Sequence, residues 1–401
     1  MSTEDDAAIC IFEELATFIV GLTPVLNLEE NNFNYWIKSN DIKEHYRKRI
    51  RDGIDGEEKD LSISEIKHFL SSVIKKIDKS VLSAQDEKGC LRTYFTHEVL
   101  EYNKIGVPNS EGIQLVKPTK LKQHKLPAFL EGYVHALRVA SSKKEALDLY
   151  QEVRVSDLYD KKLKMYKVNV NLAGESEEIG RTRIFPRSWL ENESIWLHME
   201  YKFLLEILRN ELFEEFYENF WNILVPFLKP EMYGRSVLEN SSFIVSSAHQ
   251  DEDLHGQGFV ARLSGSTAEF MHIWLYMNVG KKPFSVSPKG DLQLKFEPAL
   301  EGSLFTTKES SFSFKDIEGN SMVVKLPKNI YAFNFLGKIG VVYHNKKRLN
   351  TFGKKSALIK RVELTYRDQK NPVLIRSALI SEPYAKDIRN HKVTRIDVYF
   401  E

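Results

Sequence analysis

The chain has 401 residues and is 42% hydrophobic, which is enough for one large domain or two ordinary ones with a sizeable core. Its 57 Lys and Arg residues nearly cancel its 56 Asp and Glu residues, so a net charge of +1 offers no overall attraction to nucleic acid or to an anionic membrane. The two cysteines, Cys10 and Cys90, are too few for a disulfide scaffold or a cysteine-built zinc site. We therefore expect a cytoplasmic protein with no metal site and no nucleic-acid partner.

The first apolar stretch, residues 7–22, does not have the pattern of a signal peptide. Glu13 and Glu14 interrupt it, and acidic rather than basic residues precede it. No later stretch approaches the roughly 18 uninterrupted apolar residues of a membrane-spanning helix. We expect a soluble protein that does not associate with a membrane.

Up to about residue 280, apolar residues recur at helical spacing. The clearest case covers residues 66–81, behind a capping box formed by Ser62 and Glu65. Gly280 stands where the last of these helices would end. The other predicted helices cover residues 11–20, 128–139, 143–153, 195–208, 211–224 and 268–277. Helices joined by loops, with no strands between them, predict packed antiparallel helix pairs.

After residue 281 the pattern becomes the alternation that is typical of β-strands. Runs of this kind cover residues 292–296, 312–314, 331–335 and 396–400, and the segment from Asp316 to Asn320 predicts a hairpin turn. The two patterns together predict a mainly α protein. Its helical domain would cover residues 1–280, and a small antiparallel β domain would cover residues 281–401.

A basic run between residues 345 and 361 is the strongest charge cluster of the chain. It contains Lys346, Lys347, Arg348, Lys354, Lys355, Lys360 and Arg361. Two interpretations are open, an RNA-binding patch and a solvated loop between edge strands. The nearly neutral charge of the whole chain favours the loop.

A polar stretch between residues 233 and 270 interrupts the predicted helices. Within it, Ser264, Gly265, Ser266 and Thr267 lead directly into the helix predicted from residue 268. Hydroxyls and a glycine at a helix N-terminus gather N–H groups and side-chain donors around one point, which suits a phosphate-sized anion. The alternative is purely structural, because Ser266 and Glu269 have the spacing of a second capping box.

A second polar cluster covers residues 189–201. Glu191 stands at the mouth of a predicted helix, and His198 lies on that helix with Tyr201 three residues further on. Read alone, His198 fits a buried, hydrogen-bonded group as well as it fits a ligand.

Taken in order, these segments resemble the C-terminal half of the inverting glycoside phosphorylases, namely the cellobiose and chitobiose phosphorylases and the related β-glucan phosphorylases. The resemblance covers roughly residues 126–401 and is carried by WLENESIWLHMEYKFLLEIL, ELFEEFYENFWNILVPF, YGRSVLENSSFIVSS, HGQGFVARLSGSTAEF and GDLQLKFEPAL. In that family a helix with a histidine is followed, some sixty-odd residues later, by a Thr-Gly-Ser/Thr-Ala-x-Trp helix start that binds phosphate. Here His198 and Ser264 are 66 positions apart.

This resemblance implies a fold and a set of site residues. The helical domain would be part of an (α/α)6-barrel, a six-hairpin toroid. His198, Ser264 and Gly265 would bind phosphate, with Ser266 and Thr267 beside them. The candidate sugar-facing residues are Trp189, Glu191, Trp196, Tyr233, Glu239 and Asn240. Inorganic phosphate would be a co-substrate, and no cofactor would be needed.

The sequence departs from the family at the general acid. The Asp-Trp-Asn-Asp-like loop of the family is absent, and by order along the chain Glu98 stands nearest to its place. The N-terminal β-sandwich, the first barrel helices and an upstream arginine of the phosphate site also lack counterparts. The chain thus resembles a detached C-terminal part, and we expect the missing half in a separate chain or in a homodimer partner.

The predicted activity is phosphorolysis of a β-linked disaccharide or glucan to a sugar 1-phosphate with inversion. Phosphate is already an anionic nucleophile, so the protein has to hold it behind the anomeric carbon and to protonate the leaving oxygen. Two alternatives stay open. One is a non-catalytic carbohydrate- or phosphate-binding fragment or subunit of a split phosphorylase, and the other is a helical scaffold or RNA-associated protein that uses the basic run.

Overall fold

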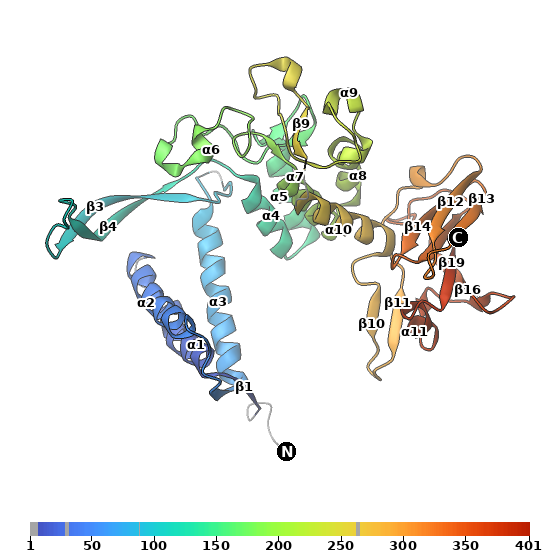
Figure 1. Ribbon diagram of the computed structural model, residues 1–401, viewed down its shortest axis with the longest axis horizontal. Helices are drawn as coiled ribbons and strands as arrows, with labels where there is room; N and C mark the ends of the chain where they lie inside the picture. The colour runs from blue at the N-terminus through green and yellow to red at the C-terminus, as the bar shows by residue number, and fades with distance from the viewer. Residues whose placement is uncertain (1–6, 29–31, 88, 262–264) are drawn as a thin grey trace. The chain divides into compact units, whose positions relative to one another are not determined.

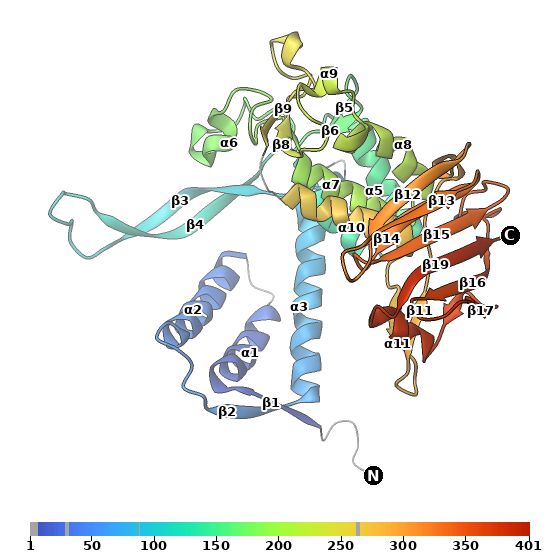
Figure 2. The same ribbon diagram turned by 45° about the vertical axis from the view of Figure 1, so that its right-hand side comes forward.

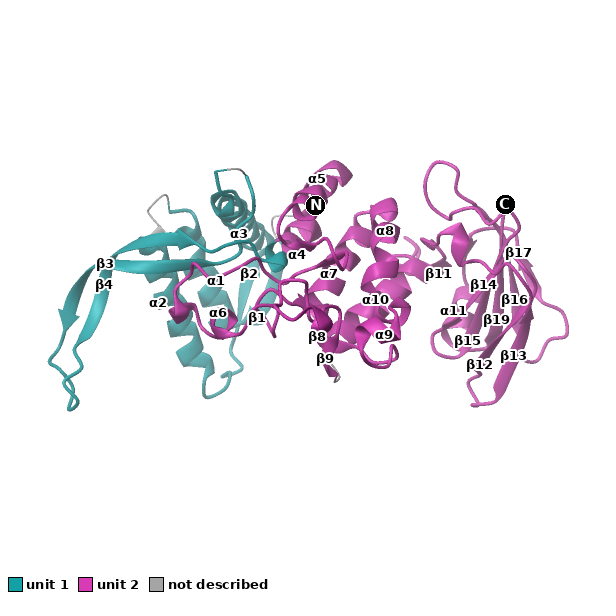
Figure 3. Cartoon of the chain, turned by 90° about the horizontal axis from the view of Figure 1, so that it is seen from above, with its two compact units in different colours: residues 1–132 teal, residues 133–401 magenta. Residues whose placement is uncertain are grey.

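The computed structural model describes residues 7–28, 32–87, 89–261 and 265–401, which fold into two compact units. Unit 1 falls within residues 1–132 and unit 2 within residues 133–401 (Figure 3). The described residues are 37% helix and 27% strand, with eleven α-helices and seven small sheets among them.

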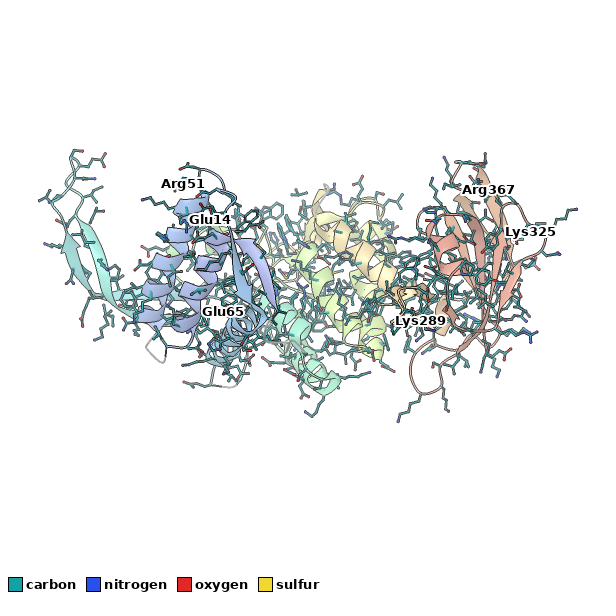
Figure 4. The ribbon with its side chains drawn as sticks, turned by 90° about the horizontal axis from the view of Figure 1, so that it is seen from below. Glu14, Arg51, Glu65, Lys289, Lys325 and Arg367 are labelled. Atoms are coloured by element: carbon teal, nitrogen blue, oxygen red, sulfur yellow. The ribbon has the colours of Figure 1, made fainter. Side chains whose placement is uncertain are left out.

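Unit 1 begins with three helices and a two-stranded ribbon (Figure 1). The helices are α1 (Glu13–Leu26), α2 (Asn32–Ile50) and α3 (Ile63–Ala84), and the ribbon is an antiparallel pair of β1 (Ala8–Phe12) and β2 (Glu58–Ser62). The predicted capping box is confirmed at the start of α3, where Glu65 is labelled in Figure 4. The Glu65 N–H donates to Ser62 Oγ at 3.1 Å, and the Ser62 N–H donates to the Glu65 carboxylate at 2.9 Å.

A long antiparallel hairpin follows in unit 1. It consists of β3 (Phe95–Ile105) and β4 (Leu115–Lys125), with irregular register between Val99 and Tyr102. Most of its side chains are exposed on both faces. The hairpin therefore lacks the alternation of buried and exposed positions by which a strand is recognised in a sequence.

Unit 2 has a helical part centred on α7 (Leu197–Arg209), whose residues Phe203, Leu204 and Leu208 are completely buried. Its other helices are α4 (Leu130–Val139), α5 (Lys143–Val155), α6 (Arg181–Ile184), α8 (Phe213–Ile223), α9 (Pro230–Tyr233) and α10 (Gly265–Val279). α10 and α8 pack against α7, as Figures 1 and 2 show. A two-stranded ribbon of β5 (Tyr159–Asp160) and β6 (Met165–Tyr166) follows α5.

A small antiparallel sheet places the starts of α7 and α10 next to each other. Its strands, in the order β7-β8-β9, are β7 (Ile195–Trp196), β8 (Ser241–Ile244) and β9 (Gly258–Ala261). Because β7 and β9 both run antiparallel to β8, they run in the same direction. β7 leads into α7 and β9 leads towards α10, so the two helices begin at the same edge of the sheet.

The remainder of unit 2 is rich in strands (Figure 2). A five-stranded sheet has the order β14 (Ile330–Phe335), β15 (Ile339–Asn345), β19 (Val393–Phe400), β16 (Ile359–Tyr366) and β17 (Val373–Ile375). In this sheet β15 and β19 are parallel, and the other pairs are antiparallel. The smaller elements are the hairpin β12 (Ser310–Lys315) with β13 (Ser321–Leu326), the sheet of β10 (Phe284–Val286), β11 (Leu292–Lys295) and β18 (Leu379–Ile380), and α11 (Tyr384–Arg389).

Two local predictions in unit 2 are confirmed. The Asp316 carboxylate accepts the N–H groups of Glu318 and Asn320, both at 2.9 Å, and so forms the turn between β12 and β13. Gly280 follows α10 with φ of 92°, and its N–H donates to the Tyr276 carbonyl at 2.8 Å. The left-handed φ explains the glycine at this helix end.

Buried tyrosines join the helical and β-rich parts of unit 2. The Tyr217 hydroxyl donates to the Ala299 carbonyl at 2.6 Å, and the Tyr343 hydroxyl donates to the Asn278 carbonyl at 2.7 Å. The change from helices to strands follows α10, but the boundary between the compact units falls at Gly132.

The basic run lies mainly in the loop between β15 and β16, where its lysines are exposed. These strands lie inside the five-stranded sheet, so the expectation of a loop between edge strands is wrong in that detail. Phe352 anchors the loop, because it is buried against Phe213 and Tyr217.

The expected mainly α fold, with strands confined to the C-terminal domain, is wrong. Among the described residues, nine strands, β1 to β9, precede residue 281. β5 to β9 have two to four residues each, too few for a period of two to be visible in a sequence. None of the described helices is both long enough and apolar enough to cross a membrane.

Candidate functional site

The candidate site lies where α7 and α10 begin. His198 is the second residue of α7, and Gly265 is the first residue of α10. A Cβ atom added to Gly265 would lie 2.5 Å or less from three atoms of the His198 imidazole. Such an approach is far inside van der Waals contact, so only glycine lets this ring lie against the start of α10.

Two helix N-termini meet at this point, and each carries a partial positive charge. The first turn of α10 contains no acidic residue, and that of α7 contains Glu200. Glu200 is completely buried, and burial raises its pKa well above the ordinary value. Its carboxyl accepts the Tyr166 N–H at 2.9 Å. Burial thus disfavours the charged form of this carboxyl, which weakens its effect on the positive end of α7.

The His198 side chain is partly accessible, with 36% of its surface exposed. Partial burial lowers the pKa of its imidazole, and Lys202 one turn further along α7 lowers it more, whereas Glu269 opposes both effects. Nε2 lies 3.7 Å from the Glu269 carboxylate. The free imidazole is therefore mostly neutral at pH 7, and a bound anion would favour its protonated form.

Glu269 and His272 are two site residues that the sequence analysis did not assign to a site. The Glu269 carboxylate also lies 3.4 Å from His272 Nδ1. Since Gly265 is already helical, Ser266 lies inside the first turn, and Glu269 faces the two histidines. The i, i+3 spacing of Glu269 and His272 is the signal that could have paired these two side chains.

A chain of hydrogen bonds ties the start of α10 to the rest of the site. The Asn240 amide donates to Thr267 Oγ1 at 3.5 Å, and the Tyr201 hydroxyl donates to Asn240 Oδ1 at 3.2 Å. Ser266 is completely buried. Ser264 lies outside the described residues.

The rings of Trp189, Trp196, Phe243 and Phe259 pack together near the start of α7, and we call them the aromatic wall. Trp196 precedes α7 and stacks on Phe243 of β8, with 6.3 Å between ring centroids. Trp189 contacts both Phe243 and Phe259 of β9, at 5.1 and 4.8 Å. Both tryptophans are half-buried, so part of each side chain remains accessible. The sequence analysis did not single out Phe243 and Phe259, because it predicted no strands in the polar stretch that contains them.

The other predicted sugar-facing residues are placed differently. Tyr233 is completely buried, and burial raises the pKa of its hydroxyl. This hydroxyl donates to the Glu239 carbonyl at 2.7 Å and accepts the Ser241 N–H at 2.8 Å, so it packs the loop before β8. Glu239 is exposed, and Glu191 pairs with Arg181 at 3.0 Å.

The candidate general acid, Glu98, lies on β3 in unit 1, whereas His198 and Gly265 belong to unit 2. Its side chain is 57% exposed, and its carboxylate lies 3.2 Å from His124 Nε2. The structure thus brings together His198, Gly265, Thr267 and Asn240, and it leaves Glu98 in the other unit.

Within the described residues, no cluster of three or more His, Cys, Asp or Glu side chains has the geometry to hold a metal ion. No protein-family model matches the chain, and no curated protein matches it. The geometry around His198 is therefore the basis on which a function can be argued.

Proposed function

We propose that the chain is a glycoside phosphorylase-like protein that holds inorganic phosphate where α7 and α10 begin. The observation that carries the proposal is the contact between the His198 imidazole and the Cα of Gly265, at the meeting point of two helix N-termini. The ordered sequence segments that resemble inverting glycoside phosphorylases predict this pair as phosphate ligands. The contact supports that prediction.

The electrostatics of the site favour an anion. The two N-termini contribute partial positive charges, Lys202 adds a full one, and His198 adds another when it is protonated. A phosphate placed there would accept hydrogen bonds from the imidazole and from N–H groups in the first turn of α10. Thr267 and Asn240 are hydrogen-bonded to each other, so they would fix the edge of the site.

Glu269 opposes an anion, because its carboxylate lies 3.7 Å from His198 Nε2. Phosphate would have to displace this contact and then tolerate a nearby negative charge. At such separations two unit charges interact by about 1 kcal/mol in water and by more in a drier site. Glu269→Gln should therefore tighten phosphate binding by at least about fivefold in a thermal-shift titration. An unchanged or weaker affinity would tell against an anion beside His198.

The aromatic wall supports the carbohydrate part of the proposal. Trp196 lies two residues before His198, and Trp189 and Trp196 both pack against Phe243. Both tryptophan rings are partly accessible, and sugar rings pack on such surfaces. In the proposed complex, a β-linked sugar packs against this wall with its anomeric carbon towards the phosphate.

The proposed step is a displacement at that carbon. A phosphate oxygen forms a bond to the anomeric carbon from the face opposite the glycosidic oxygen. The old glycosidic bond breaks, and the leaving oxygen takes a proton from a general acid. The product is an α-sugar 1-phosphate. His198 orients the phosphate, and the Thr267 hydroxyl does the same, so neither acts as the nucleophile.

A second candidate function is that of a non-catalytic phosphate- or carbohydrate-binding subunit. It is favoured by the position of Glu98, an exposed residue of unit 1 that pairs with His124. In that case a partner chain or a second copy would supply the acid.

The test combines binding and turnover. Inorganic phosphate should raise the melting temperature of the full chain, by an amount that corresponds to about 2.7 kcal/mol at one hundred times Kd. His198→Ala should abolish this shift, whereas His249→Ala should not, because the His249 ring contacts the backbone of Asp251 in a different loop.

Turnover is measured as phosphate release when sugar 1-phosphates are offered with acceptor sugars. Release that depends on His198 supports the phosphorylase. A phosphate-dependent shift without release, with and without candidate partner chains, supports the binding subunit. No shift at tens of millimolar phosphate contradicts the phosphorylase and a phosphate-binding subunit alike.

A further inference from the structure

Unit 1 contains a cavity of about 850 Å³ that the proposed function does not use. It is lined by the start of α2, the C-terminal half of α3, and the strands β3 and β4, all labelled in Figure 2. Small-molecule sites in proteins commonly have volumes of roughly 300–1,000 Å³. The cavity is therefore large enough for a ligand with a ring and a charged group.

Aromatic side chains line one part of the cavity. Phe33 and Trp36 of α2 stack, with 6.5 Å between centroids and 11° between ring planes. Phe95 of β3 contributes a third ring. Trp36 is 58% exposed although it lines a concave site. An indole that is open to a cavity offers a flat surface on which a ligand ring can stack.

Lysines line the cavity as well. Lys76 and Lys79 come from α3, and Lys117 comes from β4. The Lys76 ammonium lies over the Tyr35 ring, 3.7 Å from its centroid. Burial lowers the pKa of Lys76, and the charge of Lys79 lowers it further. Two ammonium groups therefore repel each other beside a partly buried ring.

These three lysines lack acidic partners within the described part of the chain. None of the described residues that line the cavity is Asp or Glu, and none of the described carboxylates forms a salt bridge with Lys76, Lys79 or Lys117. A fourth lining lysine, Lys120, is different, because it pairs with Glu101 at 3.2 Å. An anion in the cavity would offset the charge that the other three leave uncompensated.

We propose that this cavity binds a small organic phosphate, with its ring against Trp36 and its phosphoryl group among Lys76, Lys79 and Lys117. A phosphoryl group with two negative charges matches several ammonium groups better than a single carboxylate does. The ring is either the base of a nucleotide or the ring of a sugar phosphate, because both stack on an indole. This inference does not rest on the function proposed for the α7–α10 site.

The first experiment measures binding by isothermal titration calorimetry. The full chain carries His198→Ala, so that anion binding at the start of α7 does not contribute to the heat. Four probes are used, AMP, glucose 1-phosphate, adenosine and inorganic phosphate. We expect AMP or glucose 1-phosphate to bind at least about tenfold more tightly than adenosine and than inorganic phosphate. The tighter of the two identifies the ring as a base or a sugar.

The second experiment assigns the binding to the cavity. The double variant Lys76→Gln with Lys79→Gln should weaken the preferred probe at least about tenfold, and Trp36→Leu should weaken it as well. The matched control is Lys75→Gln, an exposed neighbour on α3 that does not line the cavity. It should leave the affinity unchanged. Because Lys117 belongs to a different element, Lys117→Gln repeats the test if circular dichroism shows that the α3 variant has lost helix.

Several outcomes overturn the proposal. Failure of both organic phosphates to bind does so, and so does adenosine or inorganic phosphate binding as tightly as they do. An unchanged affinity in the lysine and tryptophan variants, or an equal loss in Lys75→Gln, would place the binding elsewhere on the chain. Added salt should weaken binding of the preferred probe, because the lysines act through charge.

Discussion

Replacing Gly265 by alanine tests the candidate site without removing any functional group. The new methyl group would lie 2.5 Å or less from three atoms of the His198 imidazole, so the ring must move. His198 is 36% exposed and can swing towards solvent. The substitution therefore separates His198 from the start of α10 while every side chain of the site remains present.

The expected effect on stability is small, because two terms oppose each other. Alanine in place of glycine inside a helix stabilises by roughly 0.5–1 kcal/mol, and forcing a side chain away from its preferred rotamer costs about 0.5–1.5 kcal/mol. The free energy of unfolding should change by about 1 kcal/mol or less, which corresponds to roughly 2–4 °C in melting temperature for a domain near the size of unit 2. The stabilisation by phosphate, about 2.7 kcal/mol at one hundred times Kd, should largely disappear.

The assay is a thermal-shift titration with phosphate on the wild type, Gly265→Ala and a control glycine variant. Gly174→Ala is the matched control, because a Cβ at Gly174 meets no other atom within 4 Å. The reasoning is refuted if Gly265→Ala keeps the full phosphate shift. It is also refuted if Gly265→Ala and Gly174→Ala lose the shift equally.

Three further predictions follow from the same part of unit 2. A Cβ at Gly258 would lie 2.8 Å from Cζ of Tyr233, which is completely buried and cannot move towards solvent. Gly258→Ala should therefore lower the free energy of unfolding in urea by about 1–3 kcal/mol. An unchanged urea midpoint would contradict this. The folded-state pKa of His198 is lowered, so the free ring is neutral and anion binding requires its protonation. The melting-temperature shift caused by sulfate should therefore grow as the pH falls from about 8 to about 6. In His198→Gln the sulfate shift should not change with pH. For Glu193, burial raises the pKa but neighbouring cations outweigh it, so its stabilisation is present above the unfolded pKa of about 4.3 and is lost as the pH falls through the lower folded value. Glu193 pairs with Lys167, whose side chain is only 11% exposed, so Glu193→Gln should lower the free energy of unfolding in urea by about 3 kcal/mol at neutral pH. The same substitution should reduce the loss of stability on acidification. A cost below 1 kcal/mol would show that Lys167 finds other partners.

The elements that could be predicted from the sequence are those whose signal is local. α5 and α8 bury one apolar side, and their bounds lie within a few residues of the predicted ones. The capping box at Ser62 and the turn at Asp316 each rest on side chains that bond backbone groups two to four residues away. Such contacts are encoded in a short window, so spacing is enough to find them.

The strands before residue 281 could not be predicted, because their partners are distant. β7 has two residues and pairs with β8, whose first residue, Ser241, follows about 45 positions later. β3 and β4 are long, but both of their faces are exposed, so their sequence shows no buried side. α2 was missed for a similar reason, since its charged residues are spread around the helix and leave no apolar stripe.

The pairing of His198 with Gly265 combines a local and a non-local requirement. A glycine at a helix start is usually ascribed to backbone freedom, yet Gly265 is the first residue of α10 and so has helical backbone. Its conformation is open to any residue, so the backbone does not require glycine here. The requirement comes from the imidazole of His198, 67 positions earlier in the chain, which β7 and β9 bring to the same edge of one sheet. Gly265 is thus kept small by another side chain and not by its own backbone, and this is the physical reason to test Gly265 before any other position.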